Sequence, residues 1–289
     1  MSDMRPYTYV WEAGLNDPVL KITKSSLGTF VWCPKQYEFS RIDGLPTDQT
    51  EAMMKGSIIH NSHEDFFKQF DIAKAENMTH SELADYCLSL YPIDDYIDQY
   101  ETLAVFNANR FMETSEEDKP YFLPVCNEVL LDAEVTIDRA DFPHVHLHED
   151  YTIHLQGIID RIYYDREVNG YVLMELKTGM WKDGNKSKMR KEMAFYKYVI
   201  DSCSDEMLTE NGLDPDIPVT HWGWIFPASN HFYTEPVLKA SATAMLKSIS
   251  ELLVAYQDGL FPTKFSSYTC PQYCSFYGIC DSAQMDGWL

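Results

Sequence analysis

Residues 151–179, YTIHLQGIIDRIYYDREVNGYVLMELKTG, carry the clearest structural signal in this chain of 289 residues. Two apolar runs flank Asn169-Gly170, a dipeptide that is typical of a tight β-hairpin turn. Successive side chains of an extended strand point to opposite faces, so Glu175 and Lys177 share one face. We therefore predict a β-hairpin that presents a carboxylate and an ammonium group on the same surface.

Asp160 lies on that same face by parity, but its distance from Glu175 depends on the turn. A strict two-residue turn pairs Asp160 with Gly179, too far from Glu175 for a shared metal ion. A looser connection over about 165–170, shifted by an even number of residues, brings the two carboxylates level and keeps the face. Converging carboxylates suit Mg²⁺ or Mn²⁺, and a nearby ammonium such as Lys177 can hold a metal-bound water. The alternative is an exposed hairpin, since Glu-x-Lys is a common pattern.

The composition is that of a globular protein with an unusual charge. Hydrophobic residues make up 45% and charged residues 24%, which excludes a disordered or fibrous chain. Lys and Arg number 23 against 45 Asp and Glu, and the net charge of −22 disfavours nonspecific attraction to nucleic acid or anionic membrane. Residues 177–191 oppose this trend, with six basic side chains against Asp183 alone. This segment either holds a phosphate backbone or is a solvated loop before a helix.

The cysteines indicate a bound metal centre. No stretch approaches the ~20 apolar residues of a membrane span and the first residues lack signal-peptide features, so we expect a soluble, cytoplasmic, reduced protein. Cys270, Cys274 and Cys280 form C-x3-C-x5-C, and Cys33 lies far upstream. Three clustered ligands and one remote ligand favour an iron–sulfur cluster over zinc, but the spacing alone leaves both open. The remaining cysteines are expected to be buried apolar thiols: Cys87, Cys126 and Cys203.

Apolar spacing outside the hairpin predicts a mainly helical frame. We expect helices over 25–43 (opened by Ser25 or Ser26), 50–70, 80–113, 187–202 and 238–257, a strand over about 219–227 and an acidic loop over 205–216. Residues 121–177 are β-branched and alternating, and the chain therefore combines a sheet with flanking helices.

Together these motifs resemble the PD-(D/E)XK nucleases of the RecB type, in the branch with a four-cysteine iron–sulfur cluster. SSLGTFVWCPKQYEF at 25–39 is similar to the family's S-x-L-x-x-F-x-x-C-P segment, and KGSIIH supplies G-x-x-x-H, which ends at His60. GIID and ELK supply the second and third nuclease motifs. KEMAFYKYVI occupies the place of Q-x-x-x-Y, with Tyr196 matching and Glu192 replacing the glutamine. Within the family, the resemblance points to CRISPR-associated RecB-like ("Cas four") exonucleases, often found in phages, and to AddB nuclease domains.

The resemblance implies an α/β fold with a PD-(D/E)XK restriction-endonuclease-like core, a mixed central sheet flanked by helices. It implies one domain over 1–289, with a helical insertion at about 65–115 and a nuclease core at about 121–230. Cluster-binding ends would lie around Cys33 and 270–280. Three residues separate the first two late cysteines, where the family more often has two, so one residue must loop out.

The resemblance also assigns roles to individual residues. It implies catalytic roles for Asp160, Glu175 and Lys177, and a metal site of His60, Asp160, Glu175 and the Leu176 carbonyl. It implies a [4Fe–4S] cluster at Cys33, Cys270, Cys274 and Cys280, with zinc as the less favoured occupant. It implies DNA contacts by Lys182, Lys186, Lys188, Arg190, Glu192 and Tyr196.

The implied activity is a Mg²⁺- or Mn²⁺-dependent exonuclease, mainly on single-stranded DNA, in recombination, repair or CRISPR-type adaptation of a prokaryotic or phage-infected cell. An integrase, helicase or recombinase is the kind of protein partner it implies. Two alternatives are a non-catalytic adaptor that keeps the nuclease fold and an acidic DNA mimic with a zinc-stabilised tail. The charge of −22 favours these alternatives, whereas the intact set of Asp160, Glu175 and Lys177 argues against them. Glu192 adds negative charge near the metals, which weakens DNA contact or changes metal preference.

Overall fold

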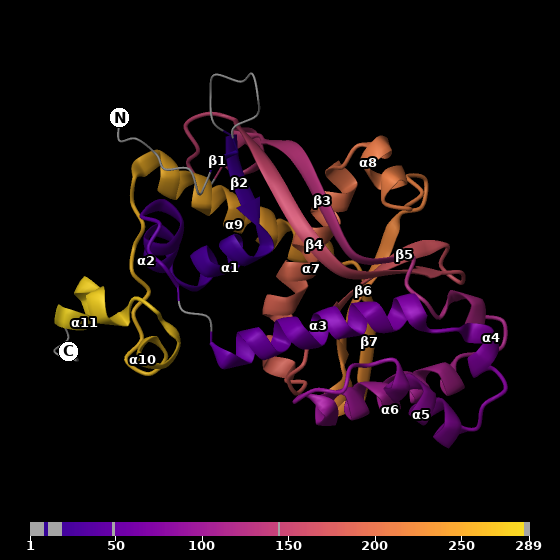
Figure 1. Ribbon diagram of the computed structural model, residues 1–289. Helices are drawn as coiled ribbons and strands as arrows, with labels where there is room; N and C mark the ends of the chain where they lie inside the picture. The colour runs from indigo at the N-terminus through magenta and orange to yellow at the C-terminus, as the bar shows by residue number, and fades with distance from the viewer. Residues whose placement is uncertain (1–8, 11–18, 48–49, 144, 286–289) are drawn as a thin grey trace.

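The computed structural model describes residues 9–10, 19–47, 50–143 and 145–285 (Figure 1). Within them a single mixed sheet has seven strands in the order β1-β2-β4-β5-β6-β7, and β3 pairs with β4. The β2–β4 and β5–β6 pairs are parallel and the other pairs are antiparallel. The strands are β1 (Tyr9–Val10), β2 (Val19–Thr23), β3 (Cys126–Ile137), β4 (Tyr151–Asp165), β5 (Gly170–Leu176), β6 (Val219–Phe226) and β7 (His231–Pro236).

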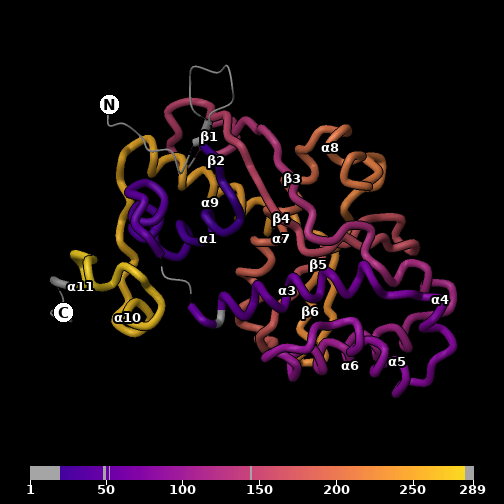
Figure 2. The backbone as a smooth tube through the Cα atoms, viewed as in Figure 1, coloured from indigo at the N-terminus to yellow at the C-terminus, as the bar shows by residue number. Residues whose placement is uncertain are grey.

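Helices cover both faces of this sheet (Figures 1 and 2). The helices are α1 (Lys24–Trp32), α2 (Pro34–Tyr37), α3 (Glu51–Gln69), α4 (Ile72–Ala75), α5 (His80–Ser89), α6 (Ile97–Glu113), α7 (Lys186–Ser202), α8 (Asp205–Glu210), α9 (Lys239–Asp258), α10 (Cys270–Tyr273) and α11 (Asp281–Met285). One core joins the sheet to α1, α7 and α9, and a second joins it to α3, α5 and α6. Alternate β5 residues serve the two cores, since Leu173 belongs to the first and Met174 to the second. This layering confirms the predicted α/β fold with a mixed sheet flanked by helices.

The structure corrects several predicted boundaries. The helix predicted over 25–43 is interrupted at Cys33, which is extended (φ −156°), and α1 begins one residue after Thr23, whose side chain accepts from the Ser26 N–H in a capping box. The prediction of a loop over all of 205–216 is wrong, because Ser204 caps α8 at the start of that segment. Strands β2 and β7 were not predicted. Among the described residues, none of the helices combines the length and hydropathy of a membrane span.

The hairpin adopts the looser of the two predicted connections. Asp165 pairs with Gly170 and Arg161 with Met174, so the next pair in this register is Asp160 with Glu175. Asn169 has a left-handed backbone (φ 45°), which asparagine tolerates in turns. The strict two-residue turn is therefore wrong, and the shift of register by an even number of residues is confirmed.

Gly223 is where β6 and β7 approach too closely for a side chain. A Cβ built on Gly223 lies 2.0 Å from the backbone oxygen of Tyr233 and 2.8 Å from Sδ of Met174. Its neighbours Trp222 and Trp224 are fully buried on the opposite face, under α7 and α9. The backbone of β6 therefore cannot move away without disturbing this core.

We expect Gly223→Ala to lower the free energy of unfolding by about 2–3 kcal/mol, because overpacking against fixed backbone costs about that much. Urea denaturation measures the change. Gly56→Ala is the matched control: Gly56 lies in α3 with open space around it, so alanine should leave stability equal or raise it by about 1 kcal/mol. Equal stabilities of wild type and Gly223→Ala would contradict the packing described for β6.

Candidate active site

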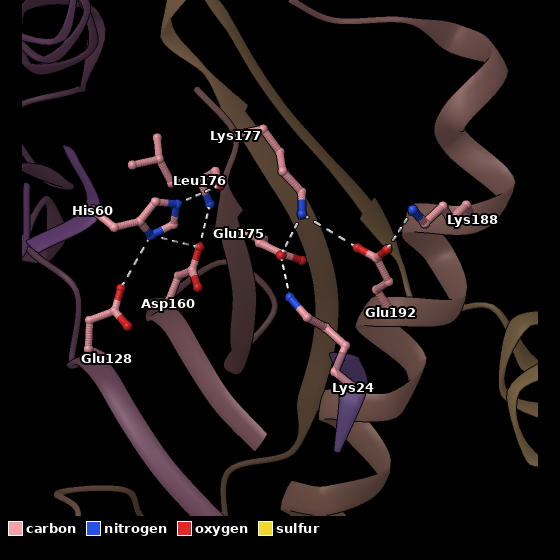
Figure 3. A network of polar contacts seen from close by, with 9 residues as sticks. All are labelled: Lys24, His60, Glu128, Asp160, Glu175, Leu176, Lys177, Lys188 and Glu192. Carbon is pink, nitrogen blue, oxygen red and sulfur yellow. Dashed lines mark hydrogen bonds and ion pairs between the residues drawn. The ribbon is translucent and has the colours of Figure 1, made fainter. Parts of the chain in front are cut away.

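Two buried carboxylates meet where β4 and β5 run side by side (Figure 3). Asp160 and Glu175 are level in the sheet and both are buried. Oδ2 of Asp160 accepts a hydrogen bond of 2.8 Å from the Leu176 backbone N–H, which fixes that carboxylate against the end of β5. Burial and the nearby charge of Glu175 raise the pKa of Asp160 above its ordinary value. Two such groups repel one another unless cations lie between or beside them.

Glu175 is held by two lysines that reach the same oxygen. Nζ of Lys177 lies 2.6 Å from Oε1 of Glu175, and Nζ of Lys24, at the start of α1, lies 2.5 Å from it. Burial by itself raises the pKa of Glu175, but the charges of Lys177 and Lys24 outweigh it and hold the pKa at about 2. The other oxygen, Oε2, is buried and has no hydrogen-bond partner among the described residues. A buried carboxylate oxygen of this kind is suited to a cation.

His60 and Glu128 complete a possible cation site beside Asp160. Nε2 of His60 lies 3.1 Å from the Leu176 carbonyl oxygen, and Nδ1 lies 3.5 Å from Oε1 of Glu128 and 3.6 Å from Oδ2 of Asp160. One ligand atom from each of the three side chains lies within 4.8 Å of the other two. Burial by itself lowers the pKa of His60, but Glu128 and Asp160 outweigh it and raise that pKa. The space between His60, Glu128 and Asp160 is thus surrounded by one nitrogen and several oxygens that can act as metal ligands. Such a ligand set fits Mn²⁺ or Mg²⁺.

Glu128 reaches this point from an unusual backbone. Its φ is 52°, in the left-handed region that few non-glycine residues adopt. It lies opposite Asp160, between the paired residues Asn127–Arg161 and Val129–Ile159 of the β3–β4 ladder. Such a conformation costs roughly 1–3 kcal/mol and tends to occur at functional sites.

Sequence reasoning missed both Glu128 and Lys24. Glu128 could be linked to Asp160 only by the β3–β4 register, which no turn dipeptide indicates because the strands are joined by a long connection. Lys24 lies immediately before the serines that were expected to open the first helix. It reaches Glu175 only because β2, which was not predicted, runs parallel to β4 and delivers α1 to the site.

The predicted DNA contacts divide into two groups. Lys182 and Lys188 are exposed, and Lys188 lies 3.9 Å from Glu192, which is also 3.5 Å from Lys177. Arg190 instead forms a bidentate salt bridge with Glu235, in which Nε and Nη2 donate to the two carboxylate oxygens at 2.6 Å and 2.5 Å. Lys186 lies over the ring of Tyr233, at 4.0 Å from its centroid.

Tyr196 lies buried against the sheet. Its side chain is only 3% exposed and packs so close to Gly157 that an added Cβ there would lie 3.0 Å from the ring. Nζ of Lys24 lies 4.8 Å from its ring centroid. In the structure Arg190 ties α7 to β7 and the Tyr196 ring lies beside Lys24, and the roles of both residues as DNA contacts stay predictions.

The four predicted cluster ligands, one from the N-terminal part of the chain and three from the C-terminal part, lie close together in the structure. Cys33, Cys270, Cys274 and Cys280 line one small cavity of about 20 Å³ between α2 and α10. Backbone N–H groups of Lys264 and Ser266 point at Cys33 Sγ (3.5 Å) and Cys270 Sγ (3.2 Å). Of the other cysteines, Cys87 and Cys126 are buried as predicted, whereas Cys203 is half-buried.

We expect Glu128→Gln to weaken Mn²⁺ binding by about tenfold or more, because it removes one charged oxygen from the site beside Asp160. Isothermal titration calorimetry with Mn²⁺ measures the affinity. Glu134→Gln is the control, since Glu134 lies on the same strand but its side chain is exposed and pairs with His154. Equal Mn²⁺ affinities of Glu128→Gln and wild type would exclude Glu128 from the site.

Comparison with known proteins assigns the chain to a family. The family model described as the PD-(D/E)XK nuclease superfamily matches residues 21–281. None of the curated proteins matches this chain. Among solved structures, the crystal structure of SSO0001 is 13% identical with a TM-score of 0.38, over 96% of this chain and 90% of that one. The crystal structure of Scheffersomyces stipitis Rai1 is 11% identical with a TM-score of 0.28, over 88% of this chain and 64% of that one.

Proposed function

Because this chain belongs to the PD-(D/E)XK nuclease superfamily, we propose that it is a divalent-metal-dependent DNA exonuclease that acts mainly on single-stranded DNA. The superfamily match supports nuclease activity and DNA as the substrate. The observation that carries the proposal is the difference between the two oxygens of Glu175: Lys177 and Lys24 bind Oε1, whereas Oε2 is buried and has no hydrogen-bond partner in the part of the chain that the structure describes. The preference for single strands and for ends rests on the sequence resemblance to RecB-like exonucleases.

The residues present fit a divalent metal ion. Asp160, Glu175, His60 and the Leu176 carbonyl would hold it, with Glu128 as a further ligand. When bound, such an ion neutralises charge on a phosphate group and lowers the pKa of a bound water. The imidazole nitrogen of His60 favours Mn²⁺ somewhat over Mg²⁺.

Lys177 and Lys24 supply the positive charge that would act on the attacking water and on the phosphoryl group during phosphodiester hydrolysis. Lys177 would orient the attacking water, because its ammonium group is fixed at the edge of the site by Glu175 and Glu192. Lys24 would stabilise the negative charge that builds on the phosphoryl group. The negative charge that Glu192 adds is compensated by Lys177 and Lys188, which lie 3.5 Å and 3.9 Å from its carboxylate oxygens.

We propose a structural [4Fe–4S] cluster for the four cysteines that line the cavity between α2 and α10. Three clustered ligands with one remote ligand, together with the sequence resemblance, favour the cluster and make zinc the less favoured occupant. Bound there, the cluster would join the two ends of a single domain over 1–289.

The resemblance also supplies the proposed setting. We propose a cytoplasmic enzyme of a prokaryotic or phage-infected cell, acting in recombination, repair or CRISPR-type adaptation. An integrase, helicase or recombinase would be its protein partner. These proposals rest on the sequence motifs and not on the geometry of the site.

We expect the wild type to degrade end-labelled single-stranded DNA with Mn²⁺ or Mg²⁺ and to be inactive in EDTA. Lys177→Ala should lower the rate by at least about a hundredfold, because general acid–base and water-orienting groups contribute about that much. Electrophoresis of the products measures the rate, and labels at either end report the polarity.

Lys197→Ala serves as the control in that assay, since Lys197 lies on α7 but pairs with Asp201 away from the carboxylates. It should cut at the wild-type rate. Lys177→Ala cutting as fast as wild type would refute the assigned mechanism. The absence of cutting by iron-replete wild type would favour the non-catalytic adaptor, with Glu192 as the first residue to revert to glutamine.

For the cluster, we expect anaerobically purified wild type to contain about four iron and four sulfide per chain. Cys274→Ala should lose most of both and should unfold at a lower temperature, because the two chain ends are then no longer joined. Cys203→Ala should keep the full iron content, since Cys203 is not among the residues that line this cavity and its thiol donates to the Asp132 carbonyl. If wild type contains one zinc per chain and no iron, the four cysteines form a zinc site and the cluster proposal is wrong.

A further inference from the structure

A groove runs along the outer side of the lysine pair, between α1 and α7. One cavity of about 390 Å³ and a second of about 300 Å³ share Lys24, Gly28, Trp32, Lys188 and Glu192, and therefore form one continuous depression. Its inner end is the Lys24 side chain that binds Glu175. The groove thus begins at the candidate active site and leads away from it.

The outer part of the groove presents aromatic rings to solvent. Trp32 ends α1 with 39% of its surface exposed, although large apolar side chains of this chain are mostly buried. Tyr273 of α10 lines the same groove and is 71% exposed. Exposed aromatic rings along a groove are suited to stacking against unpaired bases.

Positive charge lines the groove beside these rings. Lys24 lies at its inner end, and Lys188 and Lys191 of α7 line its wall. In a chain of net charge −22, three lysines at one groove are a local exception. Glu192 is the one acidic residue of the lining, and Lys177 and Lys188 compensate its charge. Lysines that follow a backbone and rings that take bases are together the chemistry of a single-stranded nucleic acid site.

We propose that this groove binds the nucleotides of a single strand next to the bond that is cut, with a base stacked on Trp32 and phosphates on Lys188 and Lys191. The inference rests on the proposed nuclease function and extends it by naming where the strand lies. The occupant is single-stranded because paired bases in a duplex do not offer their faces for stacking. A separate cavity of about 360 Å³ lies at the end of β5, where Leu176, Thr178 and Gly179 are among its lining residues.

The test is binding of a fluorescent oligo-dT to iron-replete protein in EDTA, followed by anisotropy, so that affinity is measured without cutting. Trp32→Leu should weaken binding about tenfold or more, since stacking contributes that much per base. Trp32→Phe keeps a ring and should stay within about threefold of wild type. Tyr121→Leu is the matched control, because Tyr121 is similarly exposed (41%) but lies away from the groove.

An abasic oligonucleotide of equal length separates stacking from charge. Trp32→Leu should bind it as wild type does, whereas Lys188→Ala should weaken both ligands and reduce the salt dependence by about one charge. Lys247→Ala, an exposed lysine of α9 paired with Glu251, is the control for the lysine variant and should change neither. A Trp32→Leu protein that binds oligo-dT like wild type, or that loses both ligands equally, would overturn the proposed stacking site.

Trp32 also lines the cysteine cavity, so iron content is measured for each variant. If Trp32→Leu loses iron, Tyr273→Leu decides: weaker oligo-dT binding supports the groove and unchanged binding rejects it. If wild type cuts DNA with Mn²⁺ but neither Trp32→Leu nor Tyr273→Leu weakens oligo-dT binding, the proposed groove is refuted and the proposed nuclease function is not. Wild type that neither cuts nor binds DNA would refute the proposed function itself.

Discussion

The level pairing of Asp160 with Glu175 is the constraint on which the site depends. The connection between β4 and β5 sets it by pairing Asp165 with Gly170. A slip of one residue would turn one carboxylate to the other face, and a slip of two would separate the pair by about 7 Å. The buried side chains of Ile162 and Leu173, which belong to the same core, resist either slip. The hydrophobic core under α7 therefore fixes the distance between two charged groups that would otherwise repel.

Burying two carboxylates together requires nearby positive charge, and two lysines supply it beside Glu175. Lys24 comes from α1 and Lys177 from the residue after β5. The cations are unevenly shared: Glu175 has two ammonium groups and a pKa of about 2, whereas Asp160 has a raised pKa. The Glu175 charge that contributes to stability is thus fully present above its ordinary pKa of 4.5 and is lost as the pH falls towards 2. Neither ammonium group binds Asp160 or Glu128, which lie beside His60. A divalent cation is therefore electrostatically favoured on that side of the site.

The sequence predicted what local periodicity determines. Strand alternation placed Asp160, Glu175 and Lys177 on one face, and the cysteine spacing singled out four residues that line one cavity. It could not find Lys24 or Glu128, because their roles depend on strand register and on where a helix begins in space. The DNA contacts that the resemblance implies for Arg190 and Tyr196 stay predictions, and in the structure helical geometry turns Arg190 towards Glu235 of β7 and Tyr196 towards Gly157 of the sheet. Sequence proximity to a site is a weak guide on a helix, since only every third or fourth residue shares a face.

Part of the positive charge of residues 177–191 is neutralised inside the protein and does not face solvent. Several basic residues of 177–191 are occupied within the protein: Lys177 by Glu175, Arg190 by Glu235, and Lys186 by an aromatic ring. The basic count of that segment therefore overstates the charge that faces solvent. A polyanion approaching a surface of net charge −22 is repelled over a Debye length of about 8 Å at physiological salt, and it gains attraction only close to the groove lysines. Stacking on an exposed ring is short-ranged and barely screened, so Trp32 would supply affinity where electrostatic attraction from the whole molecule does not.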